Sequence, residues 1–223
     1  MKLPSSHSIY LASIICIAEL LSISNAEAMI DLLPKEIEIS NTPVTARIIN
    51  NSERAEYVTI SLFRLTNPGA PLQDEKLEPV SLMPSPALYA FPFQISLAPG
   101  QSKNITLKPV HSVQKETVYR LEVKPILRIK NTGLEKAAGI IVNLSFSGLV
   151  RQLPVKKNDG IEIMCTATGA TLTASGTLRH RVEDLIIDGN LIPPFNVYPN
   201  FPHSVPGNSV GLSKQLPCLS RPL

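Results

Sequence analysis

Residues 139–151, which read GIIVNLSFSGLVR, carry a large apolar side chain at every second position: Ile140, Val142, Leu144 and Phe146. A period of two places these four side chains on one face of a β-strand. An ordinary sandwich strand would turn that face into its own core, whereas a strand offered to a partner would turn it outward. The alternation alone favours the ordinary core strand.

Short strands of the same kind are predicted throughout the sequence before this stretch. They alternate or are rich in β-branched and aromatic residues, and turn-forming residues lie between them. No segment shows a sustained helical period, and the 20 prolines would interrupt one. Frequent turns between short strands are typical of an all-β sandwich. The predicted strands are 37–39, 44–48, 57–63, 105–107 and 118–123, and the turns are 50–52, 67–69, 98–101 and 131–133.

A domain boundary is predicted shortly after the quoted stretch. Residues 153–160 (LPVKKNDG) are polar and contain proline and glycine, which is typical of a linker. We therefore expect a first domain of residues 29–153 and a second of residues 155–223. The second is short or incomplete, and its tail from Pro193 shows little strand signal, so we expect it to bury a small core. Its predicted strands are 161–163, 171–174 and 182–187.

The N-terminus is typical of a secretory signal peptide. Lys2 precedes an apolar run at residues 9–18, which is too short to span a bilayer. Ala26 and Ala28 then supply the small residues of a cleavage site, so residues 1–28 are expected to be removed. The alternative is an amphipathic N-terminal helix that stays attached.

Export would leave two cysteines in an oxidising compartment. Cys16 lies in the predicted signal peptide, whereas Cys165 and Cys218 remain in the exported chain. A disulfide between them and a pair of free thiols are both compatible with the sequence. The sequence does not decide whether their Cα atoms lie within about 7 Å of each other, which a disulfide requires.

The sequence predicts a protein that is not an enzyme. It contains no glycine-rich phosphate loop and no serine nucleophile elbow. The histidines have no metal-ligand spacing to one another or to the cysteines. The net charge is only +3, and lysine and arginine are scattered among acidic residues. We therefore expect no cofactor, no metal, no small-molecule substrate and no nucleic acid partner.

Five segments in order resemble the PapD-like periplasmic pilus chaperones, specifically the alternate or alpha-type class. They span about residues 29–154 and include an opening strand, a Pro-Gly turn and a strand that leads into the second domain. The segments are 29–35 (MIDLLPK), 56–60 (EYVTI), 97–107 (LAPGQSKNITL), 115–121 (KETVYRL) and 149–154 (LVRQLP). The resemblance implies an all-β protein with two Ig-like sandwich domains in a boomerang arrangement, located in the periplasm.

The resemblance also implies a mechanism. A pilin subunit is an Ig-like sandwich without its last strand, and a chaperone of this family supplies a strand of its own, which is donor-strand complementation. Ile140, Val142, Leu144 and Phe146 would enter the pilin groove and, in the free chaperone, would face solvent or a second copy of the chain. The chaperone would then deliver the pilin to an outer-membrane usher. The competing interpretation is a structural surface protein, a pilin- or adhesin-like Ig domain that keeps this strand in its own core.

The family anchors the C-terminal carboxylate of the pilin on basic side chains in the cleft between the domains. By resemblance, Lys35 takes one anchoring position. Ser147 stands where many members have lysine, so Arg120 and Arg151 are the candidates for the second. Arg151 is alternatively an interdomain residue with Glu116 as its partner.

Overall fold

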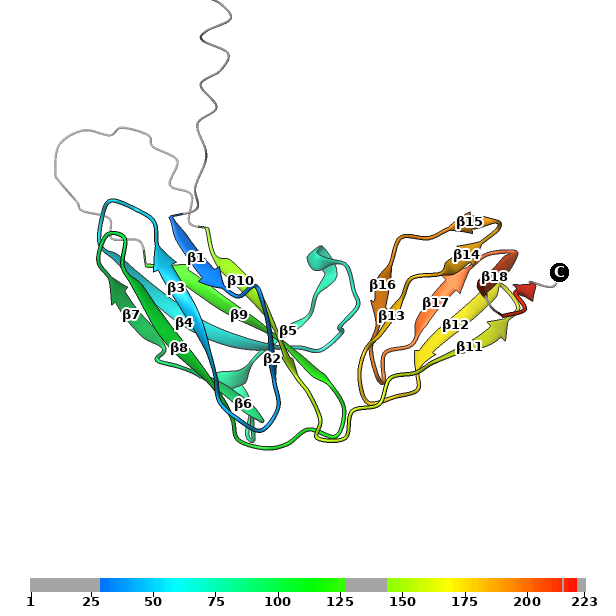
Figure 1. Cartoon of the computed structure of the whole chain (residues 1–223), viewed down its shortest axis with the longest axis horizontal. Coiled ribbons are helices and arrows are strands. Elements are labelled where there is room, and N and C mark those ends of the chain that lie inside the picture. The colour runs from blue at the N-terminus through cyan, green and yellow to red at the C-terminus, as the bar shows by residue number, and fades with distance from the viewer. Residues whose placement is uncertain (1–28, 127–143, 214, 220–223) are drawn as a thin grey trace, which may run out of the picture.

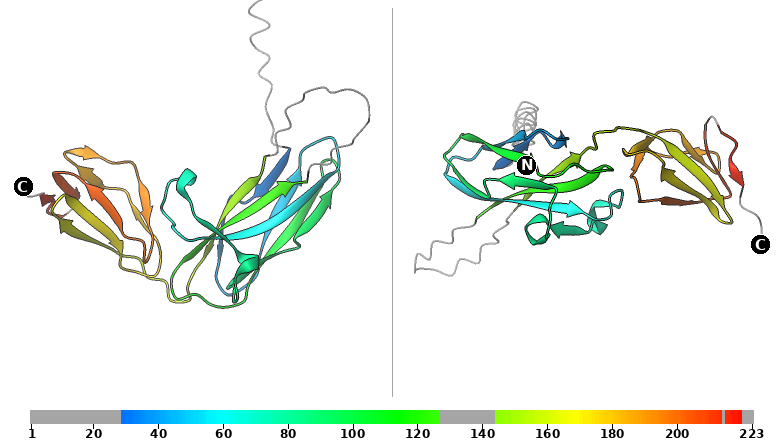
Figure 2. Two further views of the ribbon diagram at one scale, coloured as in Figure 1. Left: turned by 180° about the vertical axis from the view of Figure 1, so that it is seen from behind. Right: turned by 90° about the horizontal axis from the view of Figure 1, so that it is seen from below.

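The computed structural model describes residues 29–126, 144–213 and 215–219, and these form two β-sandwich modules (Figure 1). Strands β1 to β10 build the first module and β11 to β19 the second. The modules meet at an angle near one end, which is the boomerang shape that the resemblance implied. Both views in Figure 2 place the loop that carries the short 3-10 helix η1 (Leu72–Asp74) on the side of the first module that faces the second.

Two sheets close on one core in the first module. One has the strand order β1-β3-β8-β6, and the other has the order β2-β10-β9-β4-β5 with β7 also paired to β4. Buried and exposed side chains alternate along β3 and β4, because a strand that packs on one side buries every second residue. The strands are β1 (Ile30–Leu33), β2 (Glu36–Ile39), β3 (Val44–Asn50), β4 (Glu56–Leu65), β5 (Leu77–Pro79), β6 (Leu88–Phe91), β7 (Gln94–Leu97), β8 (Ser102–Pro109), β9 (Thr117–Pro125) and β10 (Phe146–Gln152), with a second 3-10 helix, η2 (Val80–Leu82).

The strands and turns predicted for this module are confirmed where the structure describes them. The five predicted strands lie within β2, β3, β4, β8 and β9. The turn before β8 closes through a hydrogen bond of 3.0 Å from the Gln101 amide to the Ala98 carbonyl. Gly100 in that turn has a φ of 66°, a left-handed conformation that glycine adopts without the steric cost of a Cβ. The predicted turn at 131–133 lies outside the described residues.

The second module contains more strands than the sequence predicts. Its sheets have the orders β11-β12-β17, β13-β16 and β15-β14-β18-β19. The expectation of a tail poor in strands after Pro193 is wrong, since four strands lie there. These strands are two to four residues long, which is too short to show a sustained period of two. The strands are β11 (Ile161–Thr166), β12 (Gly169–Ala174), β13 (His180–Val182), β14 (Leu185–Ile187), β15 (Asn190–Leu191), β16 (Phe195–Val197), β17 (His203–Pro206), β18 (Ser209–Leu212) and β19 (Cys218–Leu219).

A disulfide joins edge strands of two different sheets in the second module. Cys165 in β11 and Cys218 in β19 are bonded, and their Cα atoms are 5.2 Å apart. The bond spans 53 residues, and closing a loop of that length stabilises a domain by roughly 2–4 kcal/mol. The sequence left the pairing open, and the structure decides it in favour of the disulfide.

Candidate functional site

Strand β10 lies in the interior of its sheet for only part of its length. It pairs antiparallel with β9 over all seven of its residues, from Phe146 to Gln152. On its other side, β2 runs parallel to it and covers only residues 149–152. Within the described part of the chain, no strand pairs with that side of β10 at residues 146–148. The N-terminal half of β10 therefore presents an open edge.

The alternating apolar residues that precede and enter β10 have different surroundings. Leu144 lies before the strand, and 63% of its surface is exposed. Phe146 is partly buried and packs against the core of the first module. The expectation that Phe146 turns away from its own core is therefore wrong. Ile140 and Val142 lie outside the described residues.

The alternation of side chains between the two faces of β10 explains why Phe146 turns inward. Side chains alternate along a strand, so Phe146 shares its face with Val150, which is fully buried in the core. The sequence showed that the apolar residues share one face, but only the packing shows which face that is. Leu144 is exposed because the described ladder with β9 begins only at Phe146.

Lys35 lies at the point where the open edge of β10 meets β2. Its carbonyl accepts a hydrogen bond of 2.8 Å from the Leu149 amide, which holds the backbone of Lys35 against β10. Gly148 allows this approach, because a Cβ there would lie 3.3 Å from the Lys35 carbonyl oxygen and 2.9 Å from a Leu32 methyl group. The ammonium group of Lys35 pairs with Asp31 on an exposed surface. The hydrogen bond from Lys35 is the main cause that lowers the pKa of Asp31.

Arg120 lies on β9 opposite Leu149, so strand β10 separates Arg120 from Lys35. Its guanidinium group binds both carboxylate oxygens of Glu75, and the distance from Nε to Oε2 is 2.9 Å. The hydrogen bond to Glu75 raises the pKa of Arg120, against the opposing effect of burial. The pair lines a pocket of about 250 Å³ together with Phe63, Leu72, Leu77, Glu122 and Ser147.

Arg151 lies at the centre of an ion cluster near the junction of the modules, in which Arg151 and Glu116 are buried and Glu36 and Glu38 are about half exposed. Its Nε and Nη2 donate to the two carboxylate oxygens of Glu116 at 2.6 and 3.0 Å, and it also pairs with Glu36 and Glu38. The side chain of Arg151 is 9% exposed and that of Glu116 is 0% exposed. Burial alone would lower the pKa of Arg151, but the hydrogen bonds and charges of these three glutamates outweigh it and raise the pKa.

This cluster also reaches the second module. Glu116 accepts a hydrogen bond of 2.8 Å from the Arg179 amide, and the Arg179 side chain pairs with Glu36 at 2.9 Å. Tyr198 packs into a small apolar cluster with Leu65 and Val118 of the first module. The relative position of the modules therefore depends on both charged and apolar contacts.

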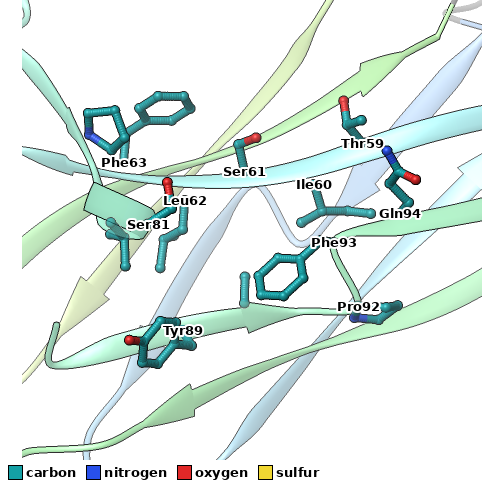
Figure 3. Close-up of a pocket in the computed structure, with 13 residues that line it drawn as sticks. Thr59, Ile60, Ser61, Leu62, Phe63, Ser81, Tyr89, Pro92, Phe93 and Gln94 are labelled. Atoms are coloured by element: carbon teal, nitrogen blue, oxygen red, sulfur yellow. The ribbon is translucent and has the colours of Figure 1, made fainter. Parts of the chain in front are cut away.

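A second hollow lies elsewhere on the first module, at the edge of β4 (Figure 3). Strand β7 pairs with β4 at residues 56–59, and β5 pairs with it at residues 63–65. Between them lies a pocket of about 550 Å³ that side chains such as Ile60, Tyr89 and Phe93 line. An apolar lining of this kind favours an apolar occupant over a charged one.

Neither a metal-binding cluster nor a membrane-spanning helix is found in the part of the chain that the structure describes. No group of three or more histidine, cysteine, aspartate or glutamate side chains is arranged to hold a metal ion within those residues. No helix within the same residues has the length and apolar character needed to cross a membrane.

The sequence pointed to Glu116 as the partner of Arg151, but it missed Glu75 as the partner of Arg120 and did not single out Arg179. Glu75 is 45 residues from Arg120 in the chain, and Glu36 is 143 residues from Arg179. Their sequence contexts resemble those of ordinary surface glutamates. Glu75 follows the predicted turn at 67–69, but nothing in the sequence indicated that this loop folds back onto the sheet.

Comparison with known proteins relates this arrangement to fimbrial proteins, although no family model matches the chain. A curated Escherichia coli protein, which is named as a subunit of CS1 fimbriae, is 25% identical over 167 residues, or 73% of this chain and 68% of that protein. The crystal structure of the class 5 fimbriae chaperone CfaA superimposes with a TM-score of 0.66 at 23% identity, covering 87% of this chain and all of the other.

A second solved structure is described as a chaperone–tip adhesin complex of CFA/I fimbriae biogenesis. It superimposes with a TM-score of 0.65 at 22% identity and covers 88% of this chain and 100% of the matched chain. Both structural matches cover the two modules together. The chain therefore has the two-module fold of the fimbrial chaperones, as the resemblance in its sequence predicted.

Proposed function

We propose that the chain is a periplasmic chaperone that binds pilin subunits by donor-strand complementation and delivers them to an outer-membrane usher. The open edge of β10 is the observation that carries this proposal. Along residues 146–148 the backbone of β10 has a strand on one side only within the described chain. An unpaired strand edge beside exposed apolar side chains such as Leu144 is a template for β-strand addition.

The geometry supports one direction for the added strand. Strand β2 runs parallel to β10 and begins at Glu36, opposite Leu149. A partner strand that runs parallel to β10 along residues 146–148 would therefore end next to Lys35. Its terminal carboxylate would gain a charge-assisted hydrogen bond there, which sets the register of the whole strand. Arg120 lies at the same level of the sheet, and Arg151 is a poorer anchor because three glutamates already surround it.

The neighbours and the fold support a pilin as the partner. One structural neighbour is described as a chaperone in complex with a tip adhesin. The curated relative is named as a fimbrial subunit, which supports the competing structural role. A pilin lacks its last strand, whereas the first module here holds β10 in place between β2 and β9. That complete sandwich favours the chaperone, and self-association through the same edge would protect it when no pilin is bound.

Export to the periplasm is the first expected result. Residues 1–28 have the charge, apolar run and small residues of a signal peptide. The protein recovered from the periplasm is therefore expected to begin at Met29, which N-terminal sequencing would measure. A chain that keeps Met1, or that stays in the cytoplasm, would contradict the proposal.

Capture of pilins is the direct test of the proposed function. A tagged chain purified from periplasm that also expresses its fimbrial operon is expected to bring down pilin subunits, identified by mass spectrometry. Lys35→Ala is expected to weaken this capture about tenfold, because it removes one charge-assisted hydrogen bond worth roughly 1.5 kcal/mol or more. Lys108→Ala, at an exposed position on β8 in the other sheet, is the matched control and should change nothing. Capture that is equal in the two variants would exclude Lys35 as an anchor.

A further inference from the structure

A third hollow, of about 400 Å³, lies between the two modules. The first module lines it with the end of β4, the turn around Pro68 and the segment that leads into β9. The second module lines it with the turn after β16, in which the Phe201 amide donates to the Tyr198 carbonyl at 3.1 Å. The start of β9 and the turn after β16 both lie at the junction of the modules (Figure 1). Because both modules supply its walls, the shape of this hollow depends on the angle between them.

Two basic side chains line the hollow without an acidic partner. Arg64, near the end of β4, is exposed. Lys115 donates a hydrogen bond of 2.7 Å to the neutral Oδ1 of Asn200 in the second module. Glu78 stands opposite Arg64 in the β4–β5 ladder, but neither it nor any other carboxylate of the described residues forms an ion pair with Arg64 or Lys115. The hollow therefore carries positive charge that the described residues leave unpaired.

Glu116 also borders the hollow, but its carboxylate faces Arg151. Both carboxylate oxygens accept hydrogen bonds from Arg151, at 2.6 and 3.0 Å, and one of them also accepts a hydrogen bond from the Arg179 amide. The Glu116 side chain is 0% exposed, so the rest of the protein covers this negative charge. An anion that enters the hollow would therefore meet the two cations without touching a carboxylate.

The other walls of the hollow are largely apolar. Leu65 and Val118 form an apolar cluster with Tyr198, and Pro68 and Phe201 continue the wall. Phe201 is 37% exposed, so part of its surface is accessible to a ligand. Small-molecule sites combine apolar walls with a few charged or polar groups, and they typically measure about 300–1,000 Å³. The hollow has both properties.

We propose that this hollow binds a small organic anion, a phosphate or carboxylate on an apolar body, and that the bound anion fixes the angle between the modules. Arg64 would hold the anion with its planar guanidinium group, which matches the geometry of phosphate and carboxylate oxygens. Lys115 supplies a second charge, and Leu65 and Phe201 lie against the apolar body. Binding favours the angle that brings the two walls together, because the anion binds that arrangement better than any other. The inference goes beyond the proposed function and does not depend on it.

A calorimetric titration of the purified chain with phenyl phosphate tests the site. This probe joins a phosphate group to one aromatic ring, and it is expected to bind at a single site. Arg64→Gln is expected to weaken its affinity at least tenfold, because the variant loses a charge-assisted hydrogen bond. Inorganic phosphate, which lacks the apolar body, should bind more weakly, and benzyl alcohol, which lacks the anion, should not bind. No binding of phenyl phosphate, or equal affinity of the natural chain and Arg64→Gln, would overturn the proposal.

Two further variants locate the site. Arg47→Gln is the matched control, because Arg47 is also an exposed arginine but lies on β3 in the other sheet, away from the hollow. Its affinity for phenyl phosphate should equal that of the natural chain. Phe201→Ser changes the wall that the second module supplies and is expected to weaken binding about fivefold, with folding checked by thermal unfolding. Full affinity in Phe201→Ser would place the anion on the first module alone and overturn a site between the modules.

NMR residual dipolar couplings, measured separately for each module, test the effect on the angle. In the free protein, motion between the modules makes their degrees of alignment differ. Saturation with phenyl phosphate is expected to make the two alignments converge, and Arg64→Gln should not show this change at the same concentration. Couplings that stay the same when the probe is bound would overturn the claim that the anion fixes the angle.

Discussion

Leu144→Asp is expected to abolish the capture of pilin subunits while the melting temperature stays close to that of the natural chain. Leu144 is 63% exposed in the free protein, so a charge at this position meets water and costs the fold little. In a complex, the same side chain would enter an apolar groove, where an unpaired carboxylate is strongly unfavourable. A penalty of about 3 kcal/mol or more corresponds to a loss of affinity of roughly a hundredfold or more.

Phe146→Asp serves as the comparison for this variant, because the two side chains differ in their surroundings. Phe146 packs against the core of the first module, so its replacement should destabilise the free protein itself by about 2 kcal/mol or more. Thermal unfolding of both purified variants, beside the pull-down, separates the two effects. Leu144→Asp that captures pilins normally would exclude donor-strand binding through this residue. A collapsed melting temperature for the same variant would identify the strand as ordinary core and favour the structural surface protein.

Arg151→Ala is expected to cause the largest loss of stability of any single substitution in the cleft. It leaves Glu116 with a fully buried carboxylate whose remaining described hydrogen bond comes from the Arg179 amide. Removing one partner of a buried ion pair typically costs about 3–5 kcal/mol. Because Glu116 also contacts the second module, we expect the angle between the modules to vary more in this variant. Urea unfolding would measure the stability, and small-angle X-ray scattering would measure the shape.

Arg181→Ala is the matched control for Arg151→Ala. Arg181 also forms an ion pair, with Glu183 at 2.8 Å, but both side chains are more than half exposed. Exposed ion pairs contribute little, because water and salt screen them. The control should therefore unfold at nearly the same urea concentration as the natural chain. Equal stability of Arg151→Ala and Arg181→Ala would show that the ion cluster does not hold the modules together.

Strand content and module order were largely predictable from the sequence, because they depend on local patterns. A period of two, β-branched residues and turn residues such as Gly100 identify strands over five to ten neighbouring positions. The same logic failed after Pro193, where strands of two to four residues form only because distant partners such as β12 and β14 pair with them. Resemblance to a family, rather than pattern, singled out Lys35, Arg120 and Arg151.

By itself, the sequence determined that the chain is an all-β protein with a linker after residue 153, and that an alternating apolar strand leads up to this linker; the two sandwiches followed from the family resemblance. Only the tertiary structure decided that Phe146 turns into the core while Leu144 stays exposed, that Cys165 and Cys218 are bonded, and that Glu75 binds Arg120. The physical reason is the range of the interactions. Alternation along a strand acts between neighbours, whereas burial, disulfides and ion pairs depend on which distant segments the fold brings together.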